Sequence, residues 1–110
     1  MLRIVLAATL CGVVSAQAAS AQDALVQKGQ QVFAAQKCTM CHAVAGKGNS
    51  KGPLDGVGAK WKADEIRQWV VNAKEMADKH KATRTPAMKD FSGLPKTDVD
   101  ALVAYLQTLK

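Results

Sequence analysis

Apolar side chains recur with a helical period in three segments of the chain, residues 23–36, 64–79 and 97–109. Within each segment they fall three or four residues apart, which places them on one face of an α-helix. In order, these apolar positions are Leu25, Gly29, Val32 and Phe33; Ile66, Trp69, Val70, Ala73 and Ala77; and Val99, Leu102, Val103, Leu106 and Leu109. The pattern predicts three main helices, each with one buried stripe.

The segments between these helices are predicted to be irregular. Residues 38–58 contain five glycines and Pro53, and residues 80–96 contain Pro86, Gly93 and Pro95. Glycine and proline interrupt regular structure, and no segment alternates with period two over the length of a strand. We therefore predict an all-α domain in which two long loops connect three main helices.

The first 21 residues have the layout of a secretory signal peptide. A short basic start containing Arg3 precedes the apolar run 4–14, and small residues of the A-x-A type follow at 16–21. The run is shorter than the roughly 20 residues that span a bilayer, although a retained membrane anchor remains the alternative. We predict cleavage after Ala21, loss of Cys11, and a periplasmic domain comprising residues 22–110.

Charge and composition then restrict the kind of domain. The net charge is +6 and is dispersed along the chain, and only 5% of the residues are aromatic. An exported domain this small usually needs a covalent or metal staple in addition to its apolar core. A disulfide between Cys38 and Cys41 would close almost no loop and would restrict the unfolded chain little. Another component is expected to complete the core.

Residues 38–42, Cys-Thr-Met-Cys-His, form the C-x-x-C-H signature of covalent haem attachment. On one helical turn Cys38 and Cys41 project to the same side, so both sulfurs can bond the vinyl groups along one edge of a haem. His42 then lies beneath the ring, where its imidazole can bind the iron. The signature predicts one covalently bound haem c.

Three other interpretations of the cysteine pair are weaker. A thioredoxin-like site needs a βαβ context that the sequence lacks. A zinc site needs about four ligands, and only His42 and His80 could join the cysteines. Adjacent Cys41 and His42 would also have difficulty pointing at one tetrahedral ion. A structural disulfide would leave the long glycine-containing loops unexplained.

The second axial ligand has four candidates, of which Met88 is favoured. Met40 lies inside the attachment turn and cannot reach the opposite face of the ring. Met76 falls near the apolar stripe of its helix, and His80 lies at the end of that helix among lysines. Met88 follows Pro86 in an irregular segment that could hold a thioether over the ring. Met76, His80 and an open iron position remain as alternatives.

Residues 24–110 resemble the class I c-type cytochromes, the small bacterial monohaem type. The resemblance implies that Gly29 and Phe33 meet the last helix at Tyr105. The loop Gly52-Pro53-Leu54 resembles one in which the proline carbonyl accepts the Nδ1 proton of the haem histidine. The stretch TPAMKDF resembles the axial-methionine loop, although Lys89 replaces the proline found there in many members. The resemblance also implies that Trp61 donates its indole N–H to a haem propionate, with simple packing as the alternative.

The resemblance implies a one-electron carrier, with His/Met ligation of the iron, that shuttles electrons between periplasmic or membrane-bound redox proteins. The donor would be a dehydrogenase or quinol-oxidising complex and the acceptor an oxidase or reductase. The alternative is a dedicated haem subunit of a periplasmic dehydrogenase. We expect an electron-transfer protein, not an enzyme, because Arg84 is isolated and no acid–base pair accompanies the Met88 segment.

Lysines occur throughout the predicted haem loops, at positions 37, 47, 51, 60, 62, 79, 81 and 89. If they surround an exposed haem edge, they would attract acidic partners and make the association rate depend on salt. The chain lacks a basic helix or a stacking platform for bases, so no nucleic-acid partner is expected. We also expect a monomer without stable membrane insertion.

Overall fold

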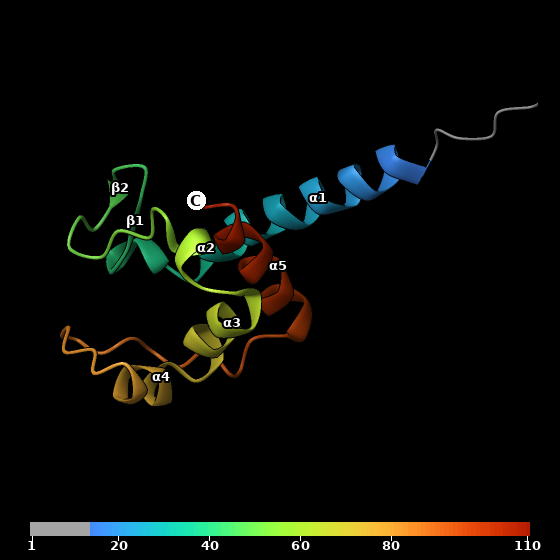
Figure 1. Ribbon diagram of the computed structural model, residues 1–110. Coiled ribbons are helices and arrows are strands. Elements are labelled where there is room, and N and C mark those ends of the chain that lie inside the picture. Colours follow the sequence, from blue (N-terminus) through green and yellow to red (C-terminus); the bar gives the residue numbers. More distant parts are fainter. Residues whose placement is uncertain (1–13) are drawn as a thin grey trace, which may run out of the picture.

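The computed structural model describes residues 14–110, and it contains the three predicted helical regions together with short elements in the first loop (Figure 1). Residues 1–13 of the predicted signal peptide lie outside the described residues. In chain order the elements are α1 (Val14–Ala35), the 3-10 helix η1 (Cys38–Met40), β1 (Ala43–Val44), β2 (Lys47–Gly48), α2 (Val57–Lys60), α3 (Ala63–Val71), α4 (Ala73–Lys79) and α5 (Lys96–Gln107).

Helix α1 begins at Val14, nine residues before the predicted start at residue 23. The added segment is rich in alanine and contains neither glycine nor proline, a composition with high helix propensity. Its side chains at positions 20–24 are exposed, whereas Gly29, Val32 and Phe33 are buried. Figure 1 shows the early turns of α1 projecting away from the rest of the domain. Only the second half of α1 belongs to the core.

The prediction of one continuous helix over residues 64–79 is wrong at Asn72. This residue has φ −132° and ψ 48°, which separates α3 from α4. In a continuous helix the Val70 carbonyl would accept a bond from residue 74. Here it accepts the N–H of Phe91 at 3.0 Å instead. The break therefore exchanges a helical hydrogen bond for one that attaches the second long loop to α3.

A small hairpin occupies part of the loop predicted over residues 38–58. Strands β1 and β2 are antiparallel and contain two residues each. Ala45 and Gly46 connect them, with φ values of 51° and 79°, as the tight turns of hairpins require. Two-residue strands are too short to leave an alternating pattern in the sequence, and the domain keeps its all-α class.

The core is centred on the crossing of α1 and α5. A Cβ atom at Gly29 would meet the Ala101 carbonyl oxygen and would lie 2.6 Å from Tyr105 Cβ. Phe33 meets Tyr105 edge to face, with ring centroids 5.6 Å apart. These contacts confirm the expected meeting of the first and last helices. Helix α5 contributes more buried side chains than any other described element, namely Val99, Ala101, Leu102, Val103, Ala104 and Leu106.

Replacing Gly29 by alanine should destabilise the folded protein by about 1–3 kcal/mol, because the added methyl group forces two packed helices apart. Gly93→Ala is the matched control, since a Cβ there would meet nothing within 4 Å. We expect this control to change the free energy of unfolding by less than about 0.5 kcal/mol. Urea unfolding of the two variants measures the difference. Equal stability of both variants would contradict the close helix crossing.

Candidate functional site

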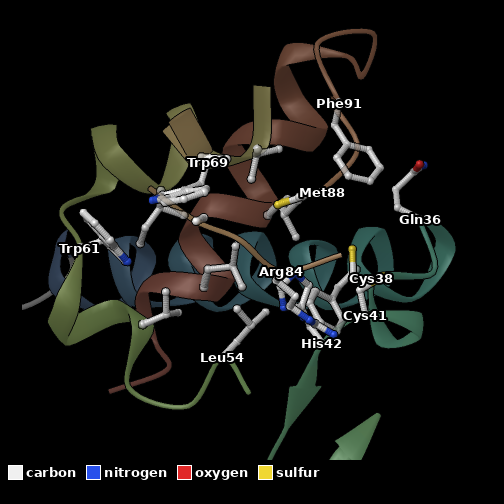
Figure 2. A pocket seen from close by; sticks show the side chains of 18 of the residues that line it. Gln36, Cys38, Cys41, His42, Leu54, Trp61, Trp69, Arg84, Met88 and Phe91 are labelled. Atoms are coloured by element: carbon white, nitrogen blue, oxygen red, sulfur yellow. The ribbon is translucent and has the colours of Figure 1, made fainter. Parts of the chain in front are cut away.

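A cavity of about 300 Å³ lies between the helices and the two long loops (Figure 2). Its volume is at the lower end of the usual range for ligand pockets, roughly 300–1,000 Å³. The lining is predominantly apolar and comes from the five α-helices and both loops. The residues on which the argument depends are Cys38, Cys41, His42, Trp61, Trp69, Arg84 and Met88. The cavity therefore includes every predicted site residue except Pro53.

The attachment turn brings both thiols to one side of this cavity. Lys37 ends α1 in a left-handed conformation, with φ 56°, and η1 begins at the next residue. The Cys38 carbonyl then accepts the N–H groups of Cys41 and His42, at 3.1 and 2.9 Å. Both cysteines are half-buried, and they form no disulfide with each other. Their thiols line the cavity one turn apart, as the signature predicted.

The thiol of Cys38 is in an environment that favours its protonated form. Burial raises the pKa of Cys38 to about 11, and the nearby Cys41 contributes in the same direction. Zinc binding and thiol–disulfide exchange both require a thiolate, which this environment disfavours. Within residues 14–110 no three or more His, Cys, Asp or Glu side chains are grouped so that they could hold a metal ion. The geometry gives no support to the zinc and thioredoxin-like interpretations.

The imidazole of His42 is oriented by the second part of the first loop. Its Nδ1 donates a hydrogen bond to the Gly52 carbonyl at 3.0 Å, which leaves the Nε2 lone pair free. Burial lowers the pKa of His42, the hydrogen bond to Gly52 opposes that effect, and the charge of Arg84 lowers the pKa further. A neutral imidazole with a free Nε2 is the form that binds a metal ion.

The expected role of the Pro53 carbonyl is wrong, because the acceptor lies one residue earlier. Ala43 forms a parallel bridge with Pro53: its N–H donates to Gly52 O at 3.0 Å, and its carbonyl accepts from the Leu54 N–H at 2.8 Å. Successive carbonyls along an extended segment point in opposite directions. The Gly52 carbonyl therefore faces His42, and that of Pro53 faces away. Pro53 is suited to its position because this pairing requires no N–H from it.

Met88 lies at the cavity, whereas the competing axial candidates do not line it. Met88 is half-buried in the second long loop, and Figure 2 shows it and His42 entering the cavity from different segments. Met76 is 7% exposed in the core of α4, and Met40 is 70% exposed on the surface. His80 is exposed and stacks on Trp69, with ring centroids 5.7 Å apart. The geometry favours Met88 among the four.

Two tryptophans form the far wall of the cavity, and Trp69 is a site residue that the sequence analysis missed. Trp61 lines the cavity as expected and meets Trp69 edge to face at 5.9 Å. The Nε1 atom of Trp69 is buried without any hydrogen-bond partner. Buried indole N–H groups normally have an acceptor. Periodicity places Trp69 only on the apolar stripe of its helix. The indole N–H, which needs an acceptor when it is buried, is the sequence feature that could have marked Trp69 as a site residue.

Arg84 is the second residue that the sequence analysis undervalued. Its guanidinium lies against Gly52, since a Cβ there would meet both Arg84 and the Cys41 carbonyl. Only glycine fits at that position. Arg84 therefore supplies positive charge at the cavity wall, close to the imidazole of His42.

Together these residues fit an iron porphyrin. The apolar cavity suits the ring, the paired thiols suit its vinyl groups, and the imidazole and thioether suit its iron. The unpartnered Trp69 N–H and the Arg84 guanidinium suit its propionates. A family model described as Cytochrome c matches residues 26–110. The chain belongs to the cytochrome c family.

Membership of the cytochrome c family implies covalent haem binding and haem-based electron transfer. The helical architecture agrees with the expected class I fold. The chain is also 29% identical to cytochrome c oxidase subunit 2 of Alkalihalophilus pseudofirmus. That similarity covers 87% of this chain and 29% of the relative, so the chain corresponds to less than a third of the longer protein. No solved structure matches the chain significantly.

Proposed function

We propose that this cytochrome is an exported one-electron carrier that holds a single haem, with His42 and Met88 as the axial ligands of its iron. The convergence of two thiols, one imidazole and one thioether on a single cavity is the observation that supports the proposal. The haem, when bound, supplies a one-electron iron couple. A methionine ligand favours the reduced iron relative to a second histidine, which suits transfer to a high-potential acceptor.

The chain's own residues have distinct roles in this proposal. Cys38 and Cys41 fix the ring covalently, and Gly52 orients His42 through the Nδ1 hydrogen bond. The Phe91–Val70 hydrogen bond attaches the loop containing Met88 to α3. A ligand loop held in this way changes little between oxidation states, so electron transfer requires little reorganisation.

The distribution of charge supports an acidic redox partner. The four ion pairs within residues 14–110 lie on the main helices, joining Lys28–Asp98, Arg67–Asp100, Lys74–Asp78 and Lys96–Asp100. In the same part of the chain, the lysines of the two long loops form no ion pair. Unpaired lysines on the two loops that contribute to the cavity would attract carboxylates on a dehydrogenase, quinol-oxidising complex, oxidase or reductase and accelerate association at low salt.

A second candidate is a haem domain that stays bound to one redox complex. The similarity to part of an oxidase subunit 2 favours it, because in that relative the similar segment belongs to a longer protein. Such a domain would copurify with its complex after solubilisation in high salt. A free carrier would instead be recovered alone, as a monomer.

Export is part of the proposal and rests on the N-terminal sequence. The side chains at positions 20–24 of α1 are exposed. Cleavage after Ala21 would therefore leave the described core intact. No helix within residues 14–110 has the length and apolarity needed to cross a bilayer. The proposed mature domain comprises residues 22–110 and is located in the periplasm.

Mass spectrometry combined with visible spectroscopy tests these statements together. The protein is expressed in a bacterium that attaches haem in its periplasm. We expect a polypeptide that begins after Ala21, a mass increase of one haem, and a far-red sulfur-to-iron absorption band in the oxidised state. A colourless mature protein would contradict the electron-carrier function, and an uncleaved chain would contradict the proposed export signal.

Trp69→Phe should destabilise the haem-loaded protein by about 1.5–3 kcal/mol, the usual contribution of a hydrogen bond to a charged group. The phenyl ring keeps much of the packing but removes the buried N–H donor. Trp61→Phe is the control, since Trp61 has no buried unpartnered atom. Urea unfolding followed at the haem absorption measures both variants. Greater destabilisation by Trp61→Phe would assign the propionate hydrogen bond to Trp61 instead of Trp69.

A further inference from the structure

His80 forms a three-ring cluster with the two tryptophans of the cavity wall. Its imidazole stacks on the Trp69 indole, with ring centroids 5.7 Å apart and an interplanar angle of 29°. It also meets Trp61 edge to face at 4.8 Å, and the two indoles meet each other at 5.9 Å. Both indoles line the haem cavity, as Figure 2 shows, whereas His80 is exposed and does not line it. The imidazole therefore lies behind the tryptophan wall, on the side that faces solvent.

The end of α4 holds this imidazole in place. His80 is the C-terminal cap of the helix, and its N–H donates to the Met76 carbonyl at 3.0 Å. The chain then turns at Lys81, whose φ of 53° lies in the left-handed region where glycine is usual. The next N–H, of Ala82, donates back to the Ala77 carbonyl at 2.9 Å. This is the Schellman arrangement of a helix end, and it fixes the backbone of His80 where its ring reaches the indoles.

The stacked imidazole covers one face of the Trp69 indole and restricts its orientation. The Nε1 atom of this indole is buried without a partner, and in the proposed function its N–H donates to a haem propionate. A hydrogen bond weakens steeply when the donor turns away from its acceptor. A ring packed against the indole therefore preserves the geometry of that bond. We expect His80 to act on the haem through Trp69.

His80 can also bring a variable charge to this wall, because histidine is the side chain that ordinarily changes charge between about pH 5 and 8. The sequence contains two histidines, and the other, His42, is assigned to the iron. The charged side chains next to His80 in the chain, or over the adjoining Trp61 ring, are Asp78, Lys79, Lys81 and Lys60. Asp78 pairs with Lys74 at 3.6 Å, and the contact from α3 is the uncharged Trp69. Lysine and aspartate ordinarily keep their charge over this range, so the imidazole is the group that changes.

We propose that His80 is a positioning residue for Trp69, and that protonation of its imidazole raises the midpoint potential of the haem. The inference rests on the proposed function and adds a pH-dependent control to it. Ferric haem carries one more positive charge than ferrous haem, so a positive charge behind the indoles disfavours the oxidised state. An imidazolium on the indole face also attracts its π electrons, which strengthens the N–H as a donor to the propionate. Both effects favour the reduced iron.

The sign of the coupling follows from the balance of electrons and protons. Reduction transfers one electron from the donor protein to ferric iron, and the positive charge lost there allows the His80 imidazole to bind a proton from water. Oxidation returns the electron to the acceptor protein and the proton to water, and no bond to the iron changes. The potential is therefore highest where the imidazole is fully protonated, falls as the pH rises through the titration of His80, and is constant above it.

Potentiometric titration of the haem-loaded protein between about pH 5 and 8 tests the coupling. We expect the wild-type potential to fall by about 30 mV, which is an about threefold change in the reduction equilibrium constant at roughly 59 mV per tenfold change. His80→Phe keeps a stacked ring without a charge and should lose most of this fall. Lys81→Gly is the matched control, because it removes a permanent charge from the next residue and suits the left-handed backbone there. It should keep the pH-dependent fall.

Hydrogen exchange of the Trp69 indole N–H, followed by NMR of the reduced protein at one pH, tests the positioning role. His80→Ala removes the stacked ring and should make this exchange about tenfold faster, because the bond to the propionate opens more often. His80→Phe should restore the slow exchange. If His80→Phe retains the full pH-dependent fall in potential, or if His80→Ala exchanges at the wild-type rate, the proposal is wrong.

Failure of the proposed function gives a different result. If the mature wild-type protein is colourless, or if chemical reductants cannot reduce its haem reversibly at any pH, the one-electron carrier itself is refuted. If the haem is reduced reversibly and the His80 variants behave like the wild type, only the role of His80 is refuted.

Discussion

Replacing Met88 by alanine should abolish the far-red sulfur-to-iron band of the oxidised protein and lower its midpoint potential by on the order of 0.1 V or more, part of the roughly 0.8 V range over which axial ligands set haem potentials. The thioether stabilises reduced iron, and an alanine methyl group cannot replace that bond. Visible spectroscopy and potentiometric titration of the haem-loaded variant measure both effects.

Met76 provides the matched control for Met88. It is a methionine of the same domain, but it is 7% exposed in the core and does not line the cavity. Met76→Leu should keep the far-red band and the potential, with only a small loss of stability from the change in side-chain shape. Persistence of the band in Met88→Ala together with its loss in Met76→Leu would transfer the axial role to Met76.

The haem-free chain should be largely unfolded at room temperature. Without the ring, the apolar side chains that line the cavity of about 300 Å³ lose their packing partner and are exposed to water. The apolar core of so small a domain rarely supplies more than about 3–5 kcal/mol. The double variant C38A/C41A, which cannot attach haem covalently, should therefore lose most of its helical circular-dichroism signal.

A second preparation separates loss of haem from the effect of the substitutions. The wild-type chain, expressed without its first 21 residues in a compartment where haem is not attached, keeps both thiols and should be equally unfolded. Far-ultraviolet circular dichroism and urea titration compare both chains with the haem-loaded protein. A cooperative unfolding transition in either colourless chain would show that the peptide core is sufficient without the ring.

The attachment turn could be predicted because its chemistry lies in adjacent residues. Cys38, Cys41 and His42 occupy one turn, so their relative placement depends on local geometry alone. The crossing of α1 and α5 was anticipated from the family resemblance, and Gly29 permits it because a Cβ there would meet Ala101 and Tyr105.

The errors arose where contacts distant in sequence decide the structure. Asn72 interrupts the second helix because Phe91, from the following loop, takes the Val70 carbonyl. The acceptor for His42 is Gly52 because the bridge between Ala43 and Pro53 determines which carbonyl points toward the imidazole. Helical periodicity has no access to the first interaction, and the expectation for Pro53 came from the family resemblance alone.

Trp69 illustrates a different limit. Periodicity correctly assigned it to the inner face of its helix, yet it did not reveal the direction of the indole N–H. The structure shows that this atom is buried and without an acceptor. The polypeptide provides no acceptor for the Trp69 N–H. Its role becomes clear only when the propionates of the proposed haem are considered together with the chain.

The pairing of α1 with α5 also determines the order of biogenesis. These two helices come from opposite ends of the domain, so a chain that emerges N-terminus first has no partner for α1 until its final residues appear. Long-range contacts of this kind form late. Until then no packed helices enclose the thiols at positions 38 and 41, so we expect haem attachment to precede compaction of the core.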